Sequence, residues 1–114
     1  MSKRHYLLFI DETPVNDDLK DYFDKFNLNV VQQKNLFPIQ INQEMPSAIL
    51  IHWSILKVQP ETIEQFYNMY PVPLIVIFDR PDEDSAINML ETGADDFVIK
   101  PLYPRELHAR ISSI

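Results

Sequence analysis

The sequence predicts an α/β fold in which one five-stranded parallel sheet lies between two layers of helices. Three observations lead to this prediction. Short apolar runs alternate five times with amphipathic stretches along the 114 residues, as in folds built from β–α units. The central runs are continuously apolar, which is typical of strands buried on both faces. The length suits one domain with its own core.

Residues 6–10 form the first predicted strand, and Asp11 and Glu12 follow it directly. The carboxyl ends of strands in open α/β sheets are where ligands bind, so the two acids are candidate site residues. A second interpretation is equally good at this point, because acids also stabilise the N-terminus of the helix that follows a strand.

A helix is predicted to begin at Thr13 and Pro14, a capping residue followed by proline in the first helical position. Its apolar side chains recur at helical spacing opposite polar ones, which favours a core stripe over a cofactor site. The stripe consists of Val15, Leu19, Tyr22, Phe23 and Phe26. Residues 30–31 begin a short second strand. Because Pro38 interrupts the next segment, we expect only a stunted helix over residues 39–45.

The third predicted strand, residues 48–51, ends at His52 and Trp53. A packed or hydrogen-bonded histidine is favoured here over a phosphate acceptor or a metal ligand. A helix begins at residues 60–61, and the fourth strand, residues 74–78, ends at Phe78 and is followed by Asp79. Acids at 82–84 begin a fourth helix that runs to about residue 92.

The last unit is the most informative stretch. Gly93 is the only glycine and supplies a turn. Residues 97–99 form a strand that ends at Lys100, where Pro101 stops the ladder and allows a cis peptide. A helix starts at Pro104 and should direct Leu107, Ile111 and Ile114 inward. The run Gly-Ala-Asp-Asp-Phe-x-x-Lys-Pro-x-x-Pro-Arg-Glu-Leu resembles the end of bacterial response-regulator receiver domains, most closely those of the winged-helix, OmpR/PhoB-like class.

This resemblance implies a flavodoxin-like (βα)5 three-layer sandwich whose strand ends gather six site positions: Asp11, Glu12, His52, Phe78, Asp79 and Lys100. In such domains the acidic pair holds magnesium and an aspartate after the third strand accepts a phosphoryl group. His52 stands at the acceptor position here, and an imidazole cannot form an acyl phosphate. Phe78 replaces a hydroxyl residue, and Asp79 replaces a small residue with a negative charge. The resemblance therefore implies a degenerate receiver domain.

Three further expectations concern that pocket. Lys100, without a phosphoryl partner, should pair with Asp11, Glu12 or Asp79, because an unpaired buried ammonium is unfavourable. Phe97 stands at the position of the family's switch aromatic. No catalytic activity and no cofactor are expected, apart from weak magnesium binding at most.

The resemblance also implies a homodimer through the fourth helix, the fifth strand and the fifth helix. By position, the interface would contain an apolar centre and a charged rim: Ile87, Leu90 and Ala109, with Asp95 or Asp96 reaching Arg110 of the partner subunit and Glu106 beside them. Glu106 and Arg110 are four residues apart, so an ordinary intrahelical bridge is an equally good interpretation of that pair.

Composition limits the function. The net charge of −7 argues against nucleic-acid binding by this segment. The absence of cysteine excludes disulfides and thiolate metal sites and fits the cytoplasm. No apolar run has membrane-spanning length. We therefore expect residues 1–114 to be the N-terminal regulatory and dimerisation domain of a longer regulator that binds DNA through a C-terminal domain.

Two alternatives stay open at this point. One is a stand-alone adaptor that binds a partner protein. The other is a divalent-metal or enzymatic site that uses Asp11, Glu12 and His52. A winged-helix domain encoded after residue 114 would favour the regulator, and a measurable metal affinity would favour the metal site.

Overall fold

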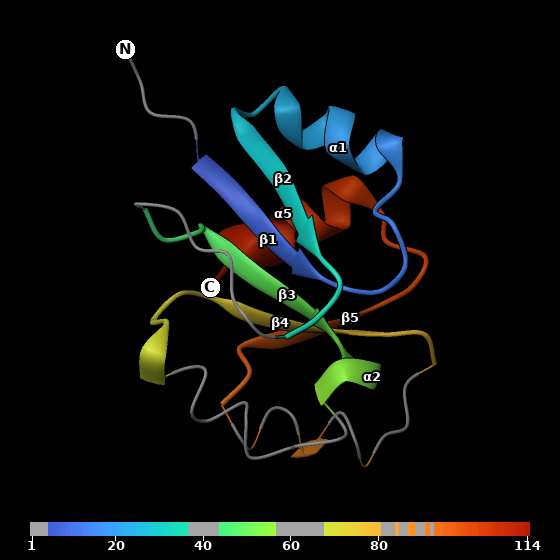
Figure 1. Cartoon of the computed structure of the whole chain (residues 1–114), viewed down its shortest axis with the longest axis vertical. Helices are drawn as coiled ribbons and strands as arrows, with labels where there is room; N and C mark the ends of the chain where they lie inside the picture. Colours follow the sequence, from blue (N-terminus) through green and yellow to red (C-terminus); the bar gives the residue numbers. More distant parts are fainter. Residues whose placement is uncertain are drawn as a thin grey trace.

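The computed structural model describes residues 5–36, 44–56, 68–80, 84, 87, 88, 91 and 93–114. Five parallel strands form one sheet in the order β2-β1-β3-β4-β5 (Figure 1), which confirms the predicted flavodoxin-like fold class. The strands are β1 (His5–Ile10), β2 (Leu28–Gln33), β3 (Ala48–His52), β4 (Leu74–Phe78) and β5 (Asp96–Ile99). Three helices have both ends within the described residues: α1 (Asp17–Asp24), α2 (Trp53–Leu56) and α5 (Pro104–Ser112).

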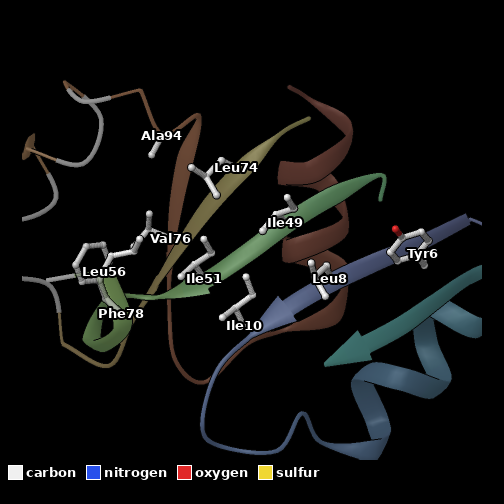
Figure 2. Packing of buried hydrophobic residues seen from close by; sticks show 10 residues of the cluster. All are labelled: Tyr6, Leu8, Ile10, Ile49, Ile51, Leu56, Leu74, Val76, Phe78 and Ala94. Atoms are coloured by element: carbon white, nitrogen blue, oxygen red, sulfur yellow. The ribbon is translucent and has the colours of Figure 1, made fainter. Parts of the chain in front are cut away.

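The sheet separates two apolar cores, because successive side chains of its buried central strands point to opposite faces. One core joins β1, β3 and β4 to Leu56 of α2 (Figure 2). The other joins the opposite side chains of the same strands to Leu19 and Phe23 of α1 and Leu107 of α5. Figure 1 shows α1 and α5 on one side of the sheet and α2 on the other. The strand ends are thereby held between two packed layers.

Helix α1 begins at Asp17, so the predicted start at Thr13 and Pro14 is wrong. The side chain of Asn16 caps the helix, with its Oδ1 accepting a hydrogen bond from the Leu19 N–H at 2.8 Å. Gln32 of β2 binds the backbone of the residues that precede α1. Its Nε2 donates to the carbonyl of Thr13 (2.7 Å), and its Oε1 accepts from the Val15 N–H (3.0 Å). These bonds tie residues 13–15 to β2, and the helix starts where they end.

Two side chains predicted to face the core are exposed, because each lies beyond the end of its helix. Phe26 follows the end of α1 and is 51% exposed, although its ring contacts Tyr22 and His108. Asn27, at φ 60°, then turns the chain into β2. Ile114 follows α5 and is exposed. Ile111, one turn earlier, packs on the core as predicted.

Several sequence predictions fall wholly or partly outside the described residues. Of the stunted helix expected over 39–45, the structure describes Glu44 and Met45, which are not helical. The helix expected from 60–61 lies outside the described part except for its last residues. In the fourth predicted helix, residues 84, 87, 88 and 91 are described and helical, whereas Leu90 is not described. The Lys100–Pro101 peptide is cis.

None of the helices in the described ranges combines the length and the apolar character needed to cross a membrane.

Candidate functional site at the carboxyl edge of the sheet

The partly buried Lys100 and the buried Asp11 form the centre of the site. Parallel pairing places the ends of β1 and β5 at the same edge of the sheet, and the two side chains meet there. Lys100 Nζ lies 2.9 Å from Asp11 Oδ2, the pairing expected from the sequence. Asp11 Oδ1 accepts a hydrogen bond from the Thr13 N–H at 3.0 Å. Both carboxylate oxygens of this buried residue are therefore engaged.

His52 lies at the end of β3 and is buried. Its Nδ1 accepts a hydrogen bond from the Ser54 N–H (3.2 Å) and lies 2.7 Å from the Ser54 hydroxyl. An accepting Nδ1 leaves the ring proton of the neutral imidazole on Nε2. Nε2 is 3.1 Å from Asp79 Oδ2, but this contact is not aligned as a hydrogen bond, and Nε2 has no hydrogen-bond partner among the described residues. His52 is thus packed and hydrogen-bonded in the structure.

Asp79 connects the two halves of the site. One carboxylate oxygen faces His52, and the other lies 4.0 Å from Lys100 Nζ. The interaction with Lys100 is weak, since Asp79 is mostly exposed and the distance exceeds hydrogen-bonding range. Glu12 is exposed, and the carboxylates found within 4 Å of Lys100 are those of Asp11 and Asp79.

Phe78 is part of the core rather than of the charged cluster. Its side chain is buried against Leu56 (Figure 2), and its ring lies 5.7 Å from Trp53 and 5.9 Å from Phe97 between centroids. Of the six predicted pocket residues, four therefore meet at one place: Asp11, His52, Asp79 and Lys100.

Comparison with known proteins shows what this chain is similar to. No protein-family model matches the chain. The phosphate regulon transcriptional regulatory protein PhoB of Klebsiella pneumoniae is 27% identical over 124 residues, and the probable transcriptional regulator ycf27 of Guillardia theta is 29% identical over 120 residues. The crystal structure of the receiver domain of the TMAO respiratory system response regulator TorR superposes with a TM-score of 0.78, at 28% identity, over 96% of this chain and 94% of that one. The chain is similar to response-regulator receiver domains in sequence and in fold.

The chain spans about half the length of the curated relatives it matches. The alignments cover 97% and 99% of this chain but 51% of PhoB and 46% of ycf27. The similarity therefore concerns about half of each of those proteins.

The residues of this site do not fit the magnesium ion that the resemblance to receiver domains implies. Mg²⁺ requires near-octahedral oxygen coordination. Asp11, the buried acid, already engages Lys100 and the Thr13 N–H, and the third strand provides a nitrogen, at His52. Within the described ranges, no group of three acidic, histidine or cysteine side chains is arranged to hold a metal ion.

On the α5 side of the domain, the charged residues of the predicted interface contact one another within one chain. Arg110 Nη1 is 3.1 Å from Asp96 Oδ2, and its Nε donates to Glu106 Oε1 at 3.2 Å. These hydrogen bonds, first that to Asp96 and then that to Glu106, raise the pKa of Arg110 above its usual value. Asp95 has another role, since its Oδ2 accepts a hydrogen bond from the Leu74 N–H at 2.8 Å.

The apolar residues of the predicted interface are exposed where they are described. Ile87 and Ala109 are both exposed, and Leu90 lies outside the described residues. Phe97, at the switch-aromatic position, is half-buried, with its ring edge-to-face against Phe78.

Sequence reasoning missed two residues that shape the candidate site. Ser54 fixes the ring of His52, and the short spacing between them was an available signal, since serine readily hydrogen-bonds to groups two residues away. Gln32 orders the loop after Asp11. No local pattern indicates this role, because Gln32 acts from another strand.

Proposed function

We propose that this chain is a receiver domain that serves as the phosphorylation-independent regulatory and dimerisation domain of a DNA-binding transcriptional regulator. By the resemblance to receiver domains, His52 stands at the position of the acceptor aspartate, and its ring nitrogens face Ser54 and Asp79. The alignment with PhoB and ycf27, both described as transcriptional regulators, supports an effector domain elsewhere in the protein. The net charge of −7 supports DNA binding by such a domain rather than by this one.

The observation that carries the proposal is the position of the Asp79 carboxylate. It lies 3.1 Å from His52 Nε2 and 4.0 Å from Lys100 Nζ, so a negative group already occupies the space between these side chains. With Asp11 also paired to Lys100, the ammonium faces two carboxylates. A phosphoryl group would add about two further negative charges there and would be repelled.

The test is direct phosphorylation. The purified domain and the PhoB receiver domain are incubated in parallel with acetyl phosphate and magnesium, and intact-mass spectrometry follows each protein before and after mild hydroxylamine treatment. We expect a hydroxylamine-labile phosphoryl adduct on the PhoB domain and none on this domain. A labile adduct on this domain would refute phosphorylation independence.

A further inference from the structure

A small cavity opens beside the Asp11–Lys100 pair. Its volume is about 170 Å³. Its lining comes from β1, the 13–16 loop, α1 and the segment after β5, and it includes both members of the charged pair. The lining residues that matter here are Phe9, Val15, Leu19, Leu102, Asp11 and Lys100. Neither His52 nor Asp79 lines it.

The wall formed by the 13–16 loop is fixed in advance of any ligand. Gln32 joins this loop to β2 through hydrogen bonds to the Asp11 and Thr13 carbonyls and from the Val15 N–H. Asn16 then caps α1. Because the loop is held by specific bonds on both sides, little ordering should accompany binding, which favours affinity for a small molecule.

The polar end of the cavity offers hydrogen-bond donors rather than acceptors. The Lys100 ammonium has three N–H groups. One points to Asp11, and Asp79 at 4.0 Å is beyond hydrogen-bond range, so two N–H groups have no partner within the described residues. Both oxygens of Asp11 are engaged, by Lys100 and by the Thr13 N–H. The two unpaired N–H groups of Lys100 therefore favour a ligand that presents an acceptor.

Charge selects against ions. An anion would approach Asp11 and a domain of net charge −7, and a cation would meet the Lys100 ammonium. The size is also limited, because a cavity of about 150 Å³ in another protein accommodates benzene. We propose that this cavity binds a small uncharged molecule, about the size of one substituted six-membered ring, whose carbonyl oxygen accepts a hydrogen bond from Lys100. The inference goes beyond the proposed function and does not depend on it.

Acetophenone is a suitable probe because it combines one ring with one carbonyl. Titrations of the ¹⁵N-labelled domain followed by NMR should give a dissociation constant of about 1 mM or tighter, with shift changes centred on Thr13, Val15 and Leu19. Toluene lacks the acceptor and should bind about tenfold more weakly, given the usual strength of a hydrogen bond to a charged group. Benzoate and benzylamine, matched in size but charged, should bind more weakly than acetophenone.

Two variants locate the site. Val15→Phe extends a lining side chain into the cavity and should abolish the acetophenone shifts, whereas Val72→Phe, the same change at a half-buried position away from the cavity, should retain them. Shifts that persist in folded Val15→Phe, absence of acetophenone binding to the wild type, or equal binding of toluene or benzoate would each overturn the proposal. None of these outcomes bears on the phosphorylation test.

Discussion

Two carboxylates lie near Lys100, and their side chains differ in exposure: 7% for Asp11 and 66% for Asp79. Asp11→Ala removes the close partner of a partly buried ammonium and the acceptor of the Thr13 N–H. We expect a loss of about 3 kcal/mol in the free energy of unfolding. Asp79→Ala should change it by less than about 1 kcal/mol, because solvent screens that contact. Urea unfolding measures both.

A matched Asp11→Asn variant separates charge from hydrogen bonding. Its side-chain oxygen can still accept from the Thr13 N–H, so its stability should lie between those of the wild type and Asp11→Ala. Equal effects of alanine at positions 11 and 79 would show that burial does not distinguish the two carboxylates.

The affinity of the site for magnesium also depends on individual residues. Because Lys100 competes for Asp11 and His52 provides no oxygen ligand, the dissociation constant for Mg²⁺ should be about 1 mM or weaker. Isothermal titration calorimetry measures it. Lys100→Met, which removes the competing cation, should bind Mg²⁺ more tightly than the wild type. A micromolar affinity of the wild type would contradict the account of the site and would favour the divalent-metal alternative.

At the scale of elements, the start of α1 can be tested with two alanine substitutions. Asn16→Ala removes the side chain that caps the Leu19 N–H and should lower the free energy of unfolding by about 1 kcal/mol. Thr13→Ala, at the cap position predicted from sequence, should cost less than about 0.5 kcal/mol. Denaturant titrations decide between the two, and a larger effect at Thr13 would mean that the helix begins earlier in solution.

The elements that were predictable from sequence are those determined by local pattern. Every residue of β1, β3 and β4 is buried except the first residue of β1. The continuously apolar sequence of these strands indicates this burial. The start of α1 was not predictable, since Thr13 and Pro14 are a valid helix start signal that hydrogen bonds from Gln32 override. Phe26 satisfied the helical period but lies beyond the last helical residue, so periodicity alone placed it in the core incorrectly.

The candidate site likewise contains contacts that were predictable from sequence and contacts that were not. The Lys100–Asp11 pair followed from topology and from the need to neutralise an ammonium. The contact between His52 and Asp79 did not, because it depends on the path of the chain after β4. The sequence predicted an ion pair between Asp96 and Arg110 of a partner subunit. In the structure, Asp96 and Arg110 form an ion pair within one chain, and sequence spacing alone did not indicate this contact.

At the scale of the whole molecule, we predict a dimer through the face that carries Ile87, β5 and α5. Since Asp96 and Glu106 occupy Arg110 within each chain, the exposed apolar residues should provide most of the affinity and the charges should set the register. Analytical ultracentrifugation at micromolar concentration should show a wild-type dimer. Ile87→Asp and Arg110→Glu should both shift it to monomer.

Arg105→Glu is the matched control for the dimer. It reverses the same charge on the same helix, but Arg105 lines a hollow with Tyr22 and His108 towards α1. This variant should remain dimeric. Circular dichroism confirms that each variant is folded. A wild type that is monomeric throughout, or a dimer unaffected by both interface substitutions, would show that this face does not mediate assembly.

The chain contains a single tryptophan, and it lies directly after His52 at the start of α2. Its half-buried ring packs on Phe78, the residue before Asp79. The fluorescence of this one indole therefore originates at the edge of the sheet where His52 and Asp79 meet. A change in hydration or packing there will shift its emission without an added dye, and no second indole contributes background. The domain thus has a built-in optical reporter of its own pocket, available for stopped-flow measurements on the unmodified protein.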